Sequence, residues 1–110
     1  MSDLSSVQGV HEQLDDIQLV DCREPYEWEA GRIAGAIHIQ VNAIMAGAGA
    51  ELDKTKSVAV ICRSGNRSEL ATMMLQARGY DATNVEGGME AWAAAGLPFE
   101  DGQGNPGRVA

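Results

Sequence analysis

The run Ser57-Val58-Ala59-Val60-Ile61 constrains the fold of this chain more than any other segment. Successive side chains of a strand point to opposite faces of a sheet, so four consecutive apolar residues require cover on both faces. Burial on both faces is typical of a central strand in a parallel sheet. Shorter runs rich in Val and Ile alternate with helical patterns around it. The chain is therefore predicted to be an α/β protein with a parallel sheet of four to five strands and helices on both faces.

Turn and cap residues divide the chain into these elements. Pro25 suits the first turn of a helix, where its missing N–H costs little, and Gly79 is a natural helix terminator. Trp28 and Trp92 are expected to pack helices against the sheet. Strands are expected at residues 17–21, 36–39, 57–61 and 82–85, and helices at residues 7–14, 25–30, 41–45, 68–78 and 89–95.

The length of 110 residues allows one compact domain with one core. We assign that domain to residues 1–99. The segment 100–110 begins Glu-Asp-Gly-Gln-Gly-Asn-Pro-Gly, which contains no apolar side chain, and we expect a flexible C-terminal tail there.

Charge and composition exclude several classes of function. The formal net charge of −8 argues against a nucleic-acid-binding surface, which needs a basic patch. No apolar run approaches the roughly 18 residues that suggest a membrane span. The first residues contain neither a basic segment nor an apolar stretch, so we expect a cytoplasmic protein. The two histidines and two cysteines do not have metal-ligand spacing, and we expect no metal and no cofactor.

A polar loop that begins with a cysteine follows the central strand. Cys62 comes directly after the apolar run and shortly before a helical pattern, so the loop amides can converge at a helix N-terminus. Arg63 and Arg67 concentrate positive charge there in an otherwise acidic chain. Gly65 permits the dihedral angles of a tight loop, and Asn66 tolerates a left-handed conformation. These features favour a thiolate that acts on a small anionic substrate.

A bland interpretation of each cysteine is also open. Cys62 could be an inert buried residue at the end of a strand, and we expect Cys22 to be one. Neither histidine is a neighbour of Cys62 in sequence, although His38 could approach it in space and form a Cys–His pair. His11 is expected on a helix surface.

Three segments together resemble the rhodanese-like sulfurtransferases, a family that includes single-domain thiosulfate sulfurtransferases. They occur in the family's order and extend over about residues 15–98, nearly the whole predicted domain. The segments are Cys62-Arg63-Ser64-Gly65-Asn66-Arg67-Ser68, Asp21-Cys22-Arg23-Glu24-Pro25-Tyr26-Glu27-Trp28 with Gly31-Arg32-Ile33-Ala34-Gly35-Ala36, and Gly79-Tyr80 with Glu86-Gly87-Gly88-Met89-Glu90-Ala91-Trp92 and Gly96-Leu97-Pro98.

The resemblance implies that Cys62 is the catalytic nucleophile. Its thiolate would take the outer sulfur of a donor such as thiosulfate as a persulfide, and cyanide, a thiol or a protein cysteine would then accept that sulfur. Arg67 would be the chief cation for the anionic donor, whereas Arg63 could point outward. The implied substrate-binding residues are Arg63, Ser64, Gly65, Asn66, Arg67 and Ser68.

The role of Arg23 stays open between two interpretations. The family's Asp-x-Arg segment ends a neighbouring strand, so Arg23 could line the rim of the pocket. A salt bridge to Asp21 or Glu24 that shapes the loop is about as well supported.

The chain departs from the family pattern at three positions. Arg32 stands where the family often has histidine, and His38 and Gln40 replace a common Asn and Pro. These residues lie away from the catalytic loop, so they bear on local packing or partner contacts. The family's N-terminal strand is hard to see in residues 4–8 and is expected to be short or absent.

Three alternative functions share the same loop. A cysteine phosphatase or arsenate reductase is less favoured, because phosphate needs a wider cradle than the four residues between Cys62 and Arg67 provide. A sulfur-carrier module that binds a partner protein, with little turnover of its own, would use the same persulfide. A redox switch between Cys22 and Cys62 requires the two sulfurs to lie at bonding distance.

Overall fold

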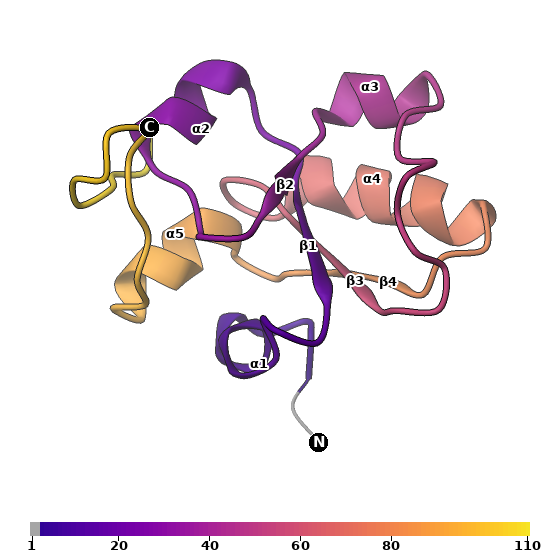
Figure 1. The fold of residues 1–110 in the computed structure, drawn as a ribbon, viewed down its shortest axis with the longest axis horizontal. Coiled ribbons are helices and arrows are strands. Elements are labelled where there is room, and N and C mark those ends of the chain that lie inside the picture. The colour runs from indigo at the N-terminus through magenta and orange to yellow at the C-terminus, as the bar shows by residue number, and fades with distance from the viewer. Residues whose placement is uncertain (1–2) are drawn as a thin grey trace.

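A computed structural model describes residues 3–110 and shows a four-stranded sheet in which every pair of neighbouring strands is parallel (Figure 1). The strand order is β2-β1-β3-β4, so β1 and β3 are central. The strands are β1 (Gln18–Asp21), β2 (Ile37–His38), β3 (Val58–Ile61) and β4 (Ala82–Asn84). The helices are α1 (Val7–Glu12), α2 (Pro25–Ala30), α3 (Val41–Met45), α4 (Asn66–Ala77) and α5 (Gly88–Ala94). The predicted α/β class with a parallel sheet is confirmed.

Helices cover both faces of the sheet because β3 is apolar on both faces, as its sequence predicted. Val58 and Val60 belong to the cluster that includes side chains of α3 and α4. Ala59 and Ile61 belong to a second cluster with side chains of α1 and α5. Figure 1 shows α3 and α4 on one side of the strands and α1 and α5 on the other.

The two tryptophans have different roles. Trp92 of α5 is fully buried in the second cluster, and its indole N–H donates to the carbonyl of Pro98 at 3.0 Å. Trp28 of α2 is only half-buried. Its ring stacks on His38 of β2 with 4.6 Å between centroids, and the guanidinium of Arg32 lies 4.8 Å from its ring centre. Two of the positions that depart from the family pattern therefore belong to one stack on Trp28.

Residues 100–110 lie against the domain, which their polar composition did not predict. Glu100 pairs with Arg32 through two backbone hydrogen bonds, and the amide of Arg108 donates to the carbonyl of Ala30 at the end of α2. Val109 packs against the second core cluster. The contacts come from main-chain groups and from one apolar residue beyond the polar run, so composition alone could not show them. That this segment is flexible stays a prediction.

The two ends of the chain and the helix boundaries refine other expectations. Between residue 3 and β1 the structure contains no strand, although the carbonyl of Ser5 accepts a hydrogen bond from the amide of Glu86. Helix α4 begins at Asn66, before the predicted start at Ser68. Within residues 3–110, every helix is too short or too polar to cross a lipid bilayer.

Candidate active site

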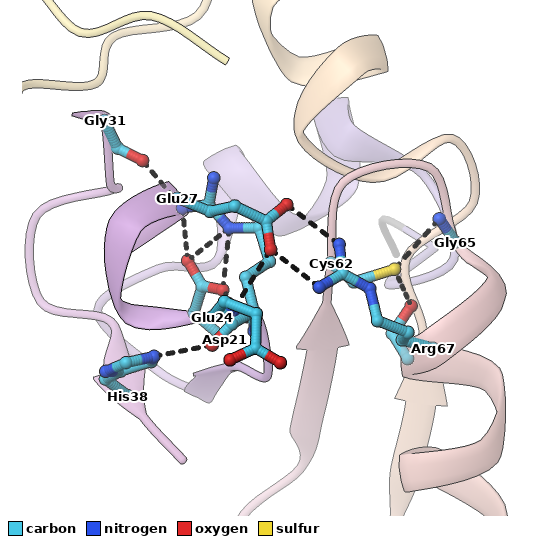
Figure 2. A network of polar contacts seen from close by, with 10 residues as sticks. Asp21, Glu24, Glu27, Gly31, His38, Cys62, Gly65 and Arg67 are labelled. Carbon is cyan, nitrogen blue, oxygen red and sulfur yellow. Dashed lines mark hydrogen bonds and ion pairs between the residues drawn. The ribbon is translucent and has the colours of Figure 1, made fainter. Parts of the chain in front are cut away.

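The sulfur of Cys62 lies directly after β3 and accepts two hydrogen bonds from its own loop. The amide of Gly65 donates to Sγ at 3.1 Å, and the hydroxyl of Ser68 lies 3.2 Å from it (Figure 2). Two donors that point at a buried sulfur stabilise the thiolate over the thiol. Cys62 is only 1% exposed, so its sulfur lies almost entirely within the site.

Two glycines give the loop its shape. Gly65 has φ +105°, the left-handed conformation that lets the chain turn from the loop into α4. Gly88, at the start of α5, has φ +56°, and a β-carbon there would lie 2.3 Å from the carbonyl oxygen of Cys62. This close approach allows the amide of Met89 to donate to that carbonyl at 2.8 Å. Gly88 and Met89 of the closing motif therefore hold the backbone of Cys62 at its carbonyl group.

Asn66 is not the left-handed residue of the loop. Among residues 3–110, positive φ angles occur only at glycines, and Asn66 is the first residue of α4. The loop therefore turns at Gly65 alone. A helix that starts at Asn66 brings the Ser68 hydroxyl into its first turn, within reach of the sulfur.

The ionisation of Cys62 depends most on the other cysteine. A hydrogen bond from the Cys22 thiol is the largest cause that lowers the pKa of Cys62, to about 4, against the opposing effect of burial. The hydroxyl and amide of Ser68 and the amide of Gly65 lower it further. The same hydrogen bond, followed by burial, raises the pKa of Cys22, so Cys22 stays a neutral thiol.

The expectation that Cys22 is an inert filler therefore missed a contributor to the site. Asp21 of β1 is in register with Ile61 of β3, and the amide of Cys22 donates to the carbonyl of Ile61 at 3.0 Å. The two cysteines follow neighbouring central strands at the same level of the sheet. That both follow apolar runs at strand ends was visible in the sequence, but the pairing of these two strands was not.

Arg67, the expected chief cation for the donor, forms an ion pair with Glu27. Its Nη1 donates to Oε1 of Glu27 at 2.6 Å and its Nη2 donates to Oε2 at 2.9 Å. Figure 2 shows Arg67 reaching from the start of α4 to Glu27 on α2. The guanidinium lowers the pKa of Glu27, and the carboxylate raises the pKa of Arg67. The Glu27 side chain is 2% exposed and the Arg67 side chain 34%. The carboxylate is therefore buried, whereas part of the arginine side chain contacts solvent.

Arg63 and Arg23, the other two arginines predicted for the site, form ion pairs of their own. Arg63 is exposed and forms a long ion pair of 3.7 Å with Glu90. Arg23 is fully buried, so it does not line a pocket rim. Its guanidinium bonds both carboxylate oxygens of Asp21 and the carbonyl of Gly31, which bears out the salt-bridge interpretation.

Some of the remaining predicted residues are exposed to solvent, and the others are buried. Ser64 and Asn66 are exposed, whereas Gly65 and Ser68 are buried beside Cys62. The Nε2 atom of His38 lies 2.7 Å from the carbonyl oxygen of Arg23, so His38 is engaged there and does not pair with Cys62.

Sequence reasoning also missed Asn84, the last residue of β4. Its Oδ1 lies 2.5 Å from the Ser68 hydroxyl, and its Nδ2 donates to the carbonyl of Gly65 at 3.1 Å. Nothing in the sequence marked this residue, because β4 and the loop are separated by the whole of α4.

Comparison with known proteins places this site in a family. The family model described as "Rhodanese-like domain" matches residues 6–95, and the chain belongs to that family. The protein named "Putative sulfurtransferase YtwF" of Bacillus subtilis (strain 168) is 39% identical over 84 residues, which cover 76% of this chain and 81% of that protein. A protein named "Sulfurtransferase" of Allochromatium vinosum is 38% identical over 86 residues, with 77% and 79% covered.

Solved structures agree with this assignment. The rhodanese-related protein of Thermoplasma volcanium superposes with a TM-score of 0.80 at 33% identity, covering 86% of this chain and 93% of that one. A rhodanese-like domain protein of Staphylococcus aureus gives a TM-score of 0.72 at 32% identity, covering 79% and 87%. Together the comparisons support sulfurtransferase activity in general for this chain.

Proposed function

We propose that this protein transfers a sulfane sulfur from thiosulfate or a similar donor to a thiophilic acceptor through a persulfide on Cys62. The observation that carries the proposal is the environment of the Cys62 sulfur. It accepts hydrogen bonds from Gly65 and Ser68, and its pKa is lowered to about 4 by the Cys22 thiol and these loop groups. A thiolate at neutral pH is the form of cysteine that attacks sulfur.

The first step forms a bond between Cys62 Sγ and the outer sulfur of the donor. The sulfur–sulfur bond of thiosulfate breaks, and sulfite leaves with the electron pair. The outer sulfur remains on Cys62 as a persulfide. The amide of Met89 donates to the carbonyl of Cys62, which holds the backbone of the nucleophile in place during this step.

The second step returns the site to its starting state. The nucleophilic atom of cyanide or of a thiolate attacks the outer sulfur, and the persulfide bond breaks with its electrons on Cys62 Sγ. Hydrogen bonds from Gly65 and Ser68 stabilise this leaving thiolate, which makes Cys62 a good leaving group as well as a good nucleophile.

Mass spectrometry of the intact protein tests the proposal. Incubation with thiosulfate should add the mass of one sulfur atom, which cyanide should remove. Cys62→Ser should abolish the gain and Cys22→Ser should retain it. A mass gain that persists in Cys62→Ser, or that disappears in Cys22→Ser, would show that Cys62 is not the residue that carries the sulfur as proposed. Turnover of an aryl phosphate without any reaction with thiosulfate would favour a phosphatase instead.

A sulfur-carrier function is the second candidate, and the Glu27–Arg67 pair supports it. A cation that is already bound by a carboxylate attracts a small dianion less strongly than a free one does. A persulfide delivered by a partner protein needs no such attraction. Slow turnover of thiosulfate together with fast sulfur exchange with a protein persulfide would select the carrier over the free-standing enzyme.

A further inference from the structure

One side chain, the amide of Asn84, contacts both loop residues that donate hydrogen bonds to the Cys62 sulfur. Its Oδ1 lies 2.5 Å from Ser68 Oγ, and its Nδ2 donates to the Gly65 carbonyl at 3.1 Å. Ser68 Oγ and the Gly65 amide lie 3.2 Å and 3.1 Å from Sγ. Asn84 is therefore one residue removed from the sulfur along two separate paths.

The path through Ser68 involves a single hydroxyl proton. Ser68 Oγ is within hydrogen-bond distance of both Cys62 Sγ and Asn84 Oδ1, but a hydroxyl donates one proton at a time. When Cys62 is a thiol, its S–H can donate to Ser68 while Ser68 donates to Asn84. When Cys62 is a thiolate, the Ser68 proton turns to the sulfur. Asn84 holds the Ser68 oxygen where it can serve both states.

The path through Gly65 runs from Asn84 to the Gly65 carbonyl, and it restricts the orientation of the peptide group that contains this carbonyl. Gly65 has φ +105°. Glycine adopts positive and negative φ about equally well, so other contacts must select this conformation. Its carbonyl accepts from Asn84 Nδ2 and, at 3.3 Å, from the amide of Glu69 in the first turn of α4. With the carbonyl held from β4, the amide on the other side of the same α-carbon points at the sulfur.

We propose that Asn84 is a positioning residue for the sulfur chemistry, which aligns the Ser68 hydroxyl and the Gly65 amide on Cys62. Asn84 does not touch the sulfur and acts only through these two donors. The inference deepens the proposed sulfur transfer and rests on it for its biological meaning. Its physical content, the dependence of the Cys62 thiolate on a side chain of β4, can be measured without any sulfur donor.

The test is the pH dependence of alkylation by iodoacetamide. Tryptic peptides separate the two cysteines, because Cys62 lies in residues 57–63 and Cys22 in residues 1–23. Asn84→Leu keeps the approximate size of the side chain and removes both hydrogen bonds. Removing the second acceptor frees the Ser68 proton for the sulfur, but it also releases the Ser68 oxygen and the Gly65 peptide from the side chain that holds them. We expect this loss of alignment to outweigh the freed proton, so that the apparent pKa of Cys62 rises by about one unit, a tenfold loss of thiolate at a pH below both values.

Gln76→Leu is the matched control. Gln76 also links α4 to β4, since its Nε2 donates to the carbonyl of Ala82 at 2.9 Å, but it contacts neither Ser68 nor Gly65. The Cys62 profile in Gln76→Leu should equal that of the parent protein. An unchanged profile in Asn84→Leu, or an equal rise in both variants, would overturn the proposal.

Two further variants keep the test decisive if Asn84→Leu does not fold. Asn84→Ala adds no bulk at this half-exposed position and should shift the profile in the same direction. Ser68→Ala combined with Asn84→Ala should raise the pKa by less than the sum of the single changes, since both act partly through one hydroxyl. An unshifted Asn84→Ala profile, or additive shifts, would contradict the positioning role.

Failure of this inference differs from failure of the proposed function. If Cys62 gains no sulfur from any donor, the proposed function fails while the alkylation profiles still report on Asn84. If the profiles of the Asn84 variants match the parent, Asn84 has no positioning role even though Cys62 carries sulfur.

Discussion

Cys22 and Cys62 follow neighbouring strands that lie in register, and this juxtaposition gives the two thiols opposite protonation states. The sulfur that accepts hydrogen bonds from Gly65 and Ser68 becomes the thiolate, and the Cys22 thiol becomes a donor to it. Arg63 and Arg67, which the sequence suggested as one source of positive potential beside the loop amides and the helix N-terminus, are paired with Glu90 and Glu27. Short-range hydrogen bonds therefore account for the ionised cysteine better than the two formal charges do.

The first prediction concerns Cys22 as a hydrogen-bond donor. Cys22→Ala should raise the apparent pKa of Cys62 by about one to two units, the usual strength of a hydrogen bond to a charged group. Cys22→Ser keeps a donor and should shift it less. In the parent protein, alkylation of Cys62 should be constant across neutral pH and should fall only as the pH drops through about 4, where the thiolate is protonated. A Cys22→Ala profile equal to the parent profile would show that the neighbouring thiol has no influence.

A second prediction follows from the paired state of Arg67. Glu27→Gln keeps an acceptor for the amide of Glu24 but removes the carboxylate that neutralises Arg67. We expect the KM for thiosulfate to fall about threefold to tenfold, because a freed cation attracts the dianion. Glu90→Gln is the control. It releases the exposed Arg63, and exposed pairs are weak, so its KM should change little. A KM that rises in Glu27→Gln would show that Glu27 serves to order Arg67 for the donor.

At the level of elements, the site depends on the contact between the start of α5 and the end of β3. Gly88 allows the amide of Met89 to reach the carbonyl of Cys62, and the amide of Glu90 donates to the carbonyl of Arg63 at 3.0 Å. A helix of the closing motif thus supports the backbone of the loop at Cys62 and Arg63.

Gly88→Ala should destabilise the protein by about 2–4 kcal/mol, because it combines a strained dihedral with a clash against backbone. Gly96→Ala is the matched control. Gly96 also has positive φ, at +72°, but no atom lies within 4 Å of a β-carbon built there. Its cost should be about 1 kcal/mol, for conformational strain alone. Urea unfolding measures both. Equal losses in the two variants would mean that the contact with Cys62 adds nothing.

Local patterns in the sequence predicted the elements well and the contacts between elements less well. Strand β3 was evident because its apolar run needs no partner to be recognised, and the loop was evident because its residues are contiguous. The Glu27–Arg67 pair and the Asn84 contacts join residues that are far apart in the chain. Their distances depend on how α2 and β4 are placed around the loop, which a single sequence does not encode in any local pattern.

At the scale of the whole molecule, the C-terminal residues 100–110 are hydrogen-bonded to α2, the helix that carries Glu27. The amide of Gly102 donates to the carbonyl of Glu29, and the amide of Arg108 donates to that of Ala30. These bonds lie within one helical turn of the residue that holds Arg67. The segment is therefore placed to steady one side of the site.

A chain that ends at Phe99 tests this connection. It should unfold at a lower temperature, and amide hydrogen exchange in α2 should be faster, because the last carbonyls of the helix lose their partners. Replacing Val109 with Ser in the full chain is the milder variant, since it removes one apolar contact and keeps the backbone bonds. Equal exchange in the truncated and full chains would support the flexible tail that the composition suggested.

The carboxylate that holds Arg67 has a consequence for the resting protein in a cell. Oxyanions such as sulfate and phosphate can bind a guanidinium through charge-assisted hydrogen bonds. With Glu27 already in that place, such ions gain little by competing at Arg67. Under the proposed function, a donor that also offers a sulfur atom to Cys62 would have a second source of binding energy that such ions lack, and the unloaded site would discriminate against common salts.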